Sequence, residues 1–270
     1  MTGYSIESHG DIKYISFDII AGTGMVSHAF TTRLGGVSSG PYSSLNLAMH
    51  VGDFQQAVLD NRKMACRALG ADLGDMVCGQ QVHKNRVHVV TEADRGRGAR
   101  DYPGAIPETD ALVTDRPGIL LSSYYADCVP ILILDPVKRA IGLIHAGWKG
   151  TVAGIAGAAL ETMGTVFGAD PGDCLAAIAP AIGPCCYEVD QPVISAVAGG
   201  GFDPSLFTSP AGTGRWKLDL PGINRAILSG AGVKSIAETG LCTSCRPDLF
   251  FSYRGQSGKC GRMASLMVLK

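Results

Sequence analysis

Two short apolar runs inside residues 126–150 constrain the fold of this chain more than any other feature. The runs Ile131–Leu134 and Ala140–Ile144 are bounded by turn residues and are too short for typical helices, so they predict buried strands. Cys128 stands just before the first run, and His145 follows the second. A thiol and an imidazole would therefore be held on rigid β elements, as precise binding sites require.

Composition narrows the class of protein. The chain has 270 residues, of which 46% are hydrophobic and 17% charged, which favours a compact fold with a large core. A net charge of −1 provides no field that would attract nucleic acid or an anionic membrane, so we expect a small-molecule partner. Nine cysteines, with no recognisable signal peptide or membrane-length apolar segment, predict reduced thiols in a cytoplasmic protein.

Apolar runs and turn residues alternate along the whole chain. The pattern predicts strands over Tyr14–Phe17, Val26–Thr31, Val87–Val90, Ala111–Val113, Ile119–Tyr124, Pro130–Leu134, Ala140–Ile144, Leu175–Ile178, Ser235–Glu238, Phe250–Tyr253 and Ser265–Leu269. Capping and breaking residues predict helices from a capping box at Asp53 and Gln56 to Gly70, from Thr151 to Gly164, over Val193–Ala198 after Asp190 and Pro192, and from Pro221 to Gly230. We therefore expect an α/β (mixed α+β) fold: a single domain, residues 1–270, with a predominantly β core of mixed sheets flanked by helices.

The residue types at the strand ends indicate a metal site. Zinc prefers Cys sulfur and His nitrogen, and a catalytic zinc keeps three protein ligands with one position open. Cys128, His145 and His83, in the segment Gln81-Val82-His83, match that set. The alternative interpretation is an ordinary buried thiol beside two hydrogen-bonded histidines.

Two glycine-rich turns are candidates for binding an anion. After His145, the N–H groups of a following helix and the Lys149 ammonium would favour phosphate, and Gly147 and Gly150 would let a ligand approach the backbone. In the other turn Arg33 could bind phosphate or a carboxylate, and Arg62 on the next helix could reach the same cleft. The alternatives are a tight turn after a strand and solvated arginines.

Four of the cysteines form two close pairs. Cys185 and Cys186 are adjacent in a loop rich in Pro and Gly, and Cys242 and Cys245 have C-x-x-C spacing. Buried thiols are the default interpretation of the first pair. A lone C-x-x-C is weak evidence for zinc or redox chemistry, and a structural zinc site made from all four is the alternative.

The motifs, taken in order, resemble those of a known family. The segments that carry the likeness are Thr32–Ser38, Ser44–Leu47, Asn61-Arg62, Gln81–His83, Thr109–Ala111, Ala126–Pro130, His145–Gly150, Ile182–Val189, Cys242-Thr243, Phe250–Arg254 and Gly261–Ser265. On these segments the chain, from about residue 25 to its end, resembles the purine nucleoside phosphorylases of the YfiH type, long labelled polyphenol oxidase or laccase-domain proteins.

The resemblance implies phosphorolysis of adenosine, inosine and methylthioadenosine, with deamination of adenosine as a further activity. It implies Zn²⁺ as the cofactor, with copper possible at the same site, and assigns both the metal and the catalysis to His83, Cys128 and His145. We expect substrate and phosphate to contact Arg33, Asn46, Arg62, Gln81, Gly147, Lys149 and Gly150. Deamination would need a carboxylate that shuttles a proton, and Asp127 and Glu188 are the candidates.

Three other functions stay open at this stage. A cysteine hydrolase acting on an amide, in peptidoglycan-precursor editing, would use Cys128 as nucleophile and His145 as base. A multicopper phenol oxidase is disfavoured because it demands many imidazoles, whereas the chain has six histidines and no His-x-His pair. A pure binding role is the third.

Overall fold

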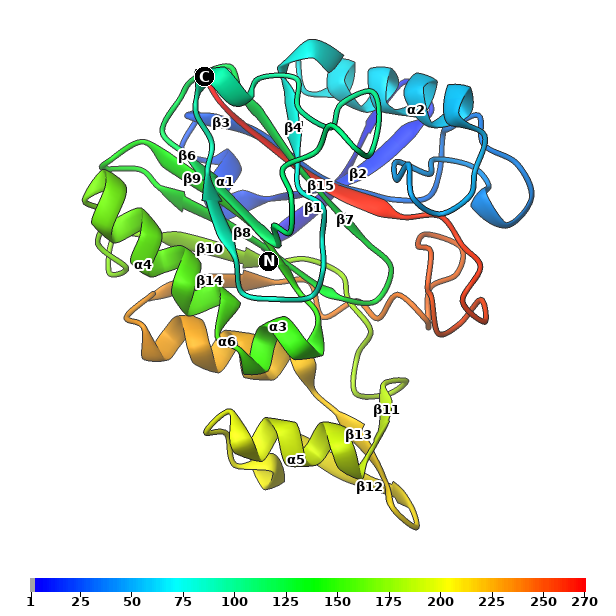
Figure 1. Ribbon diagram of the computed structural model, residues 1–270, viewed down its shortest axis with the longest axis vertical. Helices are drawn as coiled ribbons and strands as arrows, with labels where there is room; N and C mark the ends of the chain where they lie inside the picture. The colour runs from blue at the N-terminus through cyan, green and yellow to red at the C-terminus, as the bar shows by residue number, and fades with distance from the viewer. Residues whose placement is uncertain (1–2) are drawn as a thin grey trace.

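The computed structural model describes residues 3–270 and confirms a mixed α/β fold built on β-sheets (Figure 1). One six-stranded sheet has the order β1 (Tyr4–His9), β2 (Ile12–Phe17), β3 (Val26–Thr31), β15 (Met263–Leu269), β7 (Leu120–Tyr125) and β4 (Met76–Cys78). The other has the order β14 (Ser235–Glu238), β10 (Leu175–Ile178), β8 (Val129–Asp135), β9 (Ala140–Ala146), β6 (Ala111–Thr114) and β5 (Val87–Val89). Both sheets mix parallel and antiparallel pairs.

The apolar runs of β8 and β9 are explained by burial on both faces. Successive side chains of a strand point to opposite faces of its sheet. In β8, Ile131 and Ile133 pack toward α4 (Ile155–Phe167) and α6 (Leu220–Gly230), whereas Leu132 and Leu134 join a core shared with the first sheet. The two sheets therefore pack face to face, and a strand between two apolar layers shows no alternation of polar residues.

A helix covers the outer face of the first sheet as well. Ala65, Cys66 and Leu69, at the end of α2 (Gln55–Ala68), pack with Leu120 and Leu266 of β7 and β15. Figure 1 shows α2 along one side of the molecule and α4 and α6 on the opposite side. The layers run helix, sheet, sheet, helix.

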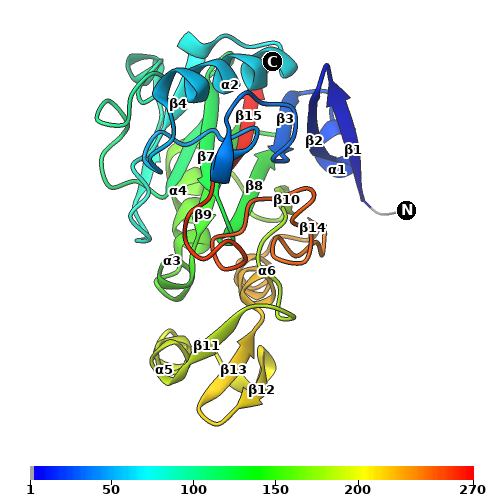
Figure 2. The same cartoon turned by 90° about the vertical axis from the view of Figure 1, so that its right-hand side faces the viewer.

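A third, small sheet lies at one end of the molecule (Figure 1, Figure 2). It has the order β11 (Glu188–Asp190), β13 (Arg215–Leu218) and β12 (Thr208–Gly212), and α5 (Gln191–Gly199) lies beside it. The remaining α-helices of the described residues are the short α1 (Asp18–Ala21) and α3 (Trp148–Val152). None of the helices within residues 3–270 combines the length and apolar character needed to cross a bilayer.

The predicted strand Phe250–Tyr253 is wrong. Those residues form a loop in which Phe250 and Phe251 are fully buried, and the backbone N–H of Phe251 donates to the side-chain sulfur of Met263 rather than to the backbone carbonyl of a neighbouring strand. Aromatic residues mark burial as strongly as they mark strands.

Two helix boundaries also differ from the prediction. The helix expected from Thr151 to Gly164 is two helices, α3 and α4, separated at Gly154, whose φ of 77° is left-handed. Gly164 lies inside α4, which ends at Phe167 and has Gly168 as its C-cap. The capping box at Asp53 is absent, because its carboxylate accepts hydrogen bonds from Ser38 and Asn46 instead.

Candidate metal centre and active site

Three distant segments bring His83, Cys128 and His145 together. Cys128 immediately precedes β8 and His145 is the penultimate residue of β9, and these strands pair antiparallel with Val129 opposite Ala146. That register places the start of β8 beside the end of β9. His83 comes from the loop after β4, where its φ of 60° is left-handed.

The ligand atoms of these three side chains lie within 4.8 Å of one another. Tetrahedral zinc with its usual bond lengths separates S and N ligands by roughly 3.4–3.6 Å, so small side-chain rotations would complete the site. One sulfur and two imidazole nitrogens also form a donor set that zinc favours. The residues therefore fit a divalent ion with one position open.

Asp110 orients the site, and sequence reasoning did not assign it a role. One oxygen of its carboxylate lies 2.9 Å from His145 Nδ1, which leaves Nε2 of that ring to face Cys128 and His83. The backbone N–H groups of Val82, His83 and Lys84 donate to the same carboxylate. One buried carboxylate therefore holds the ring of His145, as supporting carboxylates do in metal sites, and also holds the backbone of the loop that carries His83. Asp110 could have been suspected from the sequence because it stands just before β6, the strand that pairs with β9.

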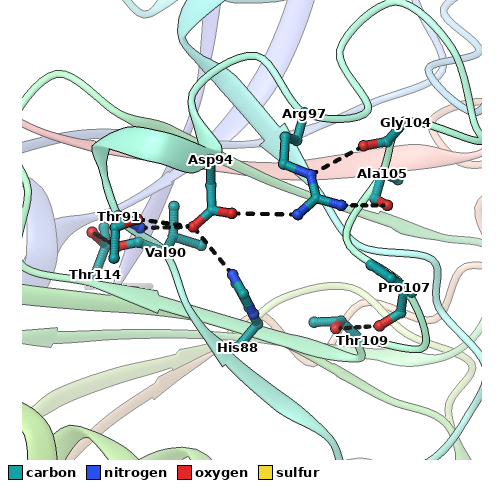
Figure 3. Close-up of polar contacts among 10 residues, drawn as sticks. All are labelled: His88, Val90, Thr91, Asp94, Arg97, Gly104, Ala105, Pro107, Thr109 and Thr114. Atoms are coloured by element: carbon teal, nitrogen blue, oxygen red, sulfur yellow. Dashed lines mark hydrogen bonds and ion pairs between the residues drawn. The ribbon is translucent and has the colours of Figure 1, made fainter.

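A polar network holds the segment that leads to Asp110 (Figure 3). The Asp94 carboxylate accepts hydrogen bonds from the backbone and hydroxyl of Thr91 and contacts His88 and Arg97. Arg97 also donates to the carbonyls of Gly104 and Ala105. These contacts hold the loop between β5 and β6 in one conformation, and that loop leads directly to Asp110.

The charges within the centre support one another. Burial alone would raise the pKa of Cys128, but the adjacent imidazoles of His145 and His83 outweigh it and lower the pKa to about 6. Burial alone would lower the pKa of His145, but the Cys128 sulfur and the Asp110 carboxylate raise it to about 9. The thiol is therefore poised to become a thiolate, the form that binds a metal.

Gly147 is required by the centre itself rather than by an approaching ligand. A Cβ at this position would lie 2.6 Å from His83 Nδ1 and 3.2 Å from Cys128 Sγ. Gly150 serves the neighbouring loop, because a Cβ there would lie 2.9 Å from the Lys84 carbonyl oxygen. Both glycines allow close packing of backbone against the site.

The three ligands line a cavity of about 520 Å³. Its remaining wall is largely aromatic and cationic: His50, Tyr124, Trp148, Lys149, Tyr187, Tyr253, Arg254 and Arg262. Burial, helped by Arg262 and Arg62, lowers the pKa of His50 to about 4, so this imidazole is neutral at pH 7. The volume matches that of small-molecule sites.

Arg254 and Arg262 replace the arginines that we expected in the cavity. The Arg254 guanidinium stacks on Tyr187, and the Arg262 guanidinium lies over Tyr253. The side-chain hydrogen bonds of both groups use Nη1 alone, donated to carbonyls and, for Arg262, also to the Cys260 sulfur. Their other N–H groups can therefore meet an anion. Both residues stand in segments that match the family. The arginines and aromatic residues grouped in those segments could have identified them as cavity residues from the sequence.

Arg33 and Arg62 are structural, contrary to the sequence-based expectation. Arg62 is 2% exposed, and its guanidinium donates to the carbonyls of Leu47, Gly98 and Ala99. Arg33 donates to the carbonyls of Ser43 and Pro247 and stacks on Phe251. Neither side chain lines the cavity. Each guanidinium instead joins loops that have no regular secondary structure.

The other expected contact residues divide between the cavity and its support. Lys149 lines the cavity, but α3 has only five residues and therefore a weak dipole, so its N-terminus is a poorer anion site than predicted. Gln81 also lines the cavity, and its amide pairs with the backbone of Tyr124. Asn46 is fully buried and binds Asp53 and the N–H of Arg262.

The two candidate carboxylates differ in access. Asp127 lines the cavity, and its oxygens accept hydrogen bonds of 2.7 Å from Thr243 Oγ1 and from the Arg254 backbone N–H. Glu188 lies outside the cavity wall and pairs with Lys217. Of the described residues lining the cavity, Asp127 is the one carboxylate.

Comparison with known proteins identifies the family. Residues 27–270 match the model of the multi-copper polyphenol oxidoreductase laccase family. The chain belongs to this family. It is 41% identical over 243 residues to purine nucleoside phosphorylase YlmD of Bacillus subtilis, covering 89% of this chain and 87% of that protein.

Other relatives of the family carry a related name and the same fold. Adenosine deaminase RL5, from an unknown prokaryotic organism, is 38% identical over 239 residues, covering 87% of this chain and 90% of that protein. The crystal structure of YlmD from Geobacillus stearothermophilus superimposes with a TM-score of 0.94 at 38% identity, covering all of both chains. The family description names several copper ions, which would need many imidazole ligands. Within the described residues, two of the six histidines, His83 and His145, belong to a cluster of candidate metal ligands.

Proposed function

We propose that this protein is a zinc-dependent purine nucleoside phosphorylase. It would use phosphate to cleave adenosine, inosine and methylthioadenosine to the free base and ribose 1-phosphate or methylthioribose 1-phosphate, and it would also deaminate adenosine. The observation that carries the proposal is a Cys/His₂ centre in the wall of a cavity with aromatic and cationic sides. The names of relatives such as YlmD and RL5 support the substrate class.

The aromatic side chains are suited to a purine nucleoside. Trp148, Tyr187 and Tyr253 line the cavity, and every purine offers a π-face that can stack on such rings. Ile182 and Leu220 add apolar wall beside them. Stacking tolerates changes at C6 of the base, which fits an enzyme that accepts both adenosine and inosine.

The cationic side chains are suited to phosphate. Lys149, Arg254 and Arg262 line the same cavity, and the two guanidinium groups have uncommitted N–H donors. Planar guanidinium groups bind phosphate through paired hydrogen bonds, and lysine adds a point charge. Phosphorolysis forms a bond between a phosphate oxygen and C1′ while the C1′–N9 bond breaks, and the purine leaves with the electron pair. We assign to these cations the alignment of phosphate for that displacement.

The centre of His83, Cys128 and His145 would hold the zinc. A zinc ion there would supply a Lewis acid with one position open to substrate or water. Asp110 lies 2.9 Å from His145 Nδ1, so it would keep the ring in the tautomer whose Nε2 is available to bind the ion. For deamination, Asp127 is the carboxylate that would carry the proton, because it lines the cavity next to Cys128.

A cysteine hydrolase is the rival function. Cys128, His145 and Asp110 have the order of a nucleophile, a base and an orienting carboxylate. The second imidazole, His83, has no part in such a triad, whereas a zinc site needs it. The metal requirement therefore separates the two functions.

The test is a product analysis on metal-assayed protein. We expect adenine from adenosine only when phosphate is present, and inosine in its presence or absence. Cys128→Ala should lose the metal and both products, whereas Cys174→Ala, which removes a buried thiol that belongs to no cluster of candidate ligands, should keep them. Activity that survives complete removal of metal would favour the hydrolase, and oxygen uptake with a phenol would favour the oxidase.

A further inference from the structure

A second cluster of potential ligands lies outside the Cys/His₂ centre. The sulfur atoms of Cys185, Cys186, Cys242 and Cys245 lie within 4.8 Å of one another. All four residues are free cysteines. The proposed reaction uses none of them, so the gathering of four thiols at one point needs its own explanation.

The spacing of the sulfurs is that of a metal site rather than of disulfides. Cys245 Sγ lies 3.5 Å from Cys185 Sγ and 3.4 Å from Cys186 Sγ. A disulfide requires about 2.05 Å. Four sulfurs bound to zinc at about 2.3 Å each stand roughly 3.8 Å apart at the corners of a tetrahedron. Small rotations of the side chains would take the cluster to that geometry.

The backbone around the cluster is arranged to bring two turns together. Cys185 and Cys186 lie in a turn in which the N–H groups of Cys186 and Tyr187 bond to the Gly183 carbonyl. The other turn begins at Cys242, which forms an isolated bridge with Ala181. The Gly183 N–H donates to Cys242 Sγ at 3.3 Å, a contact that stabilises a thiolate.

Gly183 also provides the space for the sulfurs. A Cβ on this residue would lie 3.4 Å from Cys185 Sγ and 3.3 Å from Cys242 Cβ, so a side chain here would pack directly against the cluster. Its backbone N–H and its missing side chain therefore serve the same group of thiols.

We propose that Cys185, Cys186, Cys242 and Cys245 bind a second zinc ion, with a structural role. Four protein ligands fill a tetrahedral shell and leave no position for substrate, which is the pattern of structural zinc. The ion would clamp the two turns to each other without taking part in the reaction.

The clamp lies next to the cavity. Ile182 and Tyr187, on either side of the first turn, line the cavity. Thr243, in the second turn, donates its hydroxyl to Asp127, the neighbour of Cys128. The second ion would therefore fix one wall of the proposed active site. This inference stands independently of the proposed function, because it depends only on the four thiols.

The experiment counts metal ions in the full chain. Protein stripped with a chelator under reducing conditions is titrated with Zn²⁺, and bound zinc is measured by elemental analysis after gel filtration. We expect two equivalents for the parent chain. Cys245→Ala and Cys185→Ala remove exposed thiols, so these variants should fold and bind one equivalent. Cys128→Ala should also bind one, and Cys128→Ala combined with Cys245→Ala none. Cys174→Ala is the matched control and should bind two.

Two further measurements separate the possible outcomes. Co²⁺ bound to Cys128→Ala should give the absorption of a tetrahedral thiolate site. Hydrogen exchange of residues 181–187 and 242–246 should quicken in Cys245→Ala and stay unchanged in Cys174→Ala. The inference would be overturned if the parent chain bound one equivalent of zinc that Cys245→Ala kept and Cys128→Ala lost. A disulfide among the four thiols in purified protein would overturn it as well. If the parent chain bound one equivalent of zinc that Cys128→Ala kept and Cys245→Ala lost, the result would support the inference and contradict the assignment of zinc to Cys128.

Discussion

Gly147→Ala tests whether the Cys/His₂ centre tolerates any displacement of its ligands. The new Cβ would lie 2.6 Å from His83 Nδ1, whereas ordinary contacts begin at 3.4 Å, so the imidazole must retreat by about 0.8 Å. Metal–ligand distances vary by only about 0.2 Å. We therefore expect metal affinity to fall by about 100-fold or more, equivalent to roughly 2.8 kcal/mol, with a comparable loss of nucleoside cleavage.

The fold should survive this substitution. Gly147 has φ −69° and ψ 165°, a conformation open to alanine, so the free energy of unfolding of the metal-free protein should change by less than about 1 kcal/mol. Gly157→Ala is the matched control: the added methyl meets only Ile227 Cγ2 at 3.9 Å, and alanine favours the helix α4. Competition with a chromophoric chelator gives the affinity of each variant. Unchanged affinity in Gly147→Ala would refute the assignment of His83 and Cys128 as ligands.

Three further substitutions probe the supporting structure. Asp110→Asn should lower metal affinity by about 10–100-fold in the same chelator competition, because the tautomer of His145 is no longer fixed; an unchanged value would contradict the orienting role. Arg62→Met should reduce the free energy of unfolding, measured in urea, by roughly 2–5 kcal/mol because three carbonyls lose their donor. The KM for phosphate should stay constant. A raised KM would restore the phosphate-binding role that we first expected for Arg62. Burial lowers the pKa of His28 to about 4, and its Nε2 accepts the N–H of Phe17, so the neutral ring is the folded form. The contribution of the neutral His28 ring to the free energy of unfolding should be complete above pH 6.5 and fall by about 3 kcal/mol as the pH drops toward 4. His28→Leu should make the free energy of unfolding less dependent on pH in this range. Equal pH dependence in the parent chain and the variant would argue against this role of His28.

The sequence predicted best the elements whose local pattern and tertiary environment agree. Val26–Thr31, Leu175–Ile178 and Ser235–Glu238 were predicted with the observed boundaries, because each contains at least one β-branched residue and lies between segments with glycine, proline or polar residues. Strand β1 was missed because five of its six residues are exposed and mostly polar. Pairing with β2 forms it, and a single-strand pattern cannot show that partner.

The candidate site divides in the same way. His83, Cys128 and His145 could be selected because their donor chemistry and their places near strand ends are visible in the sequence. Arg62 could not be interpreted correctly, because the carbonyls of Gly98 and Ala99 that bind it are supplied by a loop distant in sequence. Arginine counts as polar in any hydropathy pattern, so its burial depends on contacts that only the folded chain reveals.

The place of β15 in the first sheet has a consequence for biosynthesis. This strand lies between β3 and β7, so residues 263–269 join segments that a ribosome would have made far earlier. Until those residues emerge, β3 and β7 each present an unpaired edge, which is a template for aggregation. A nascent chain should therefore depend on chaperones until translation passes residue 269, and premature termination before β15 should yield a product that cellular proteases remove.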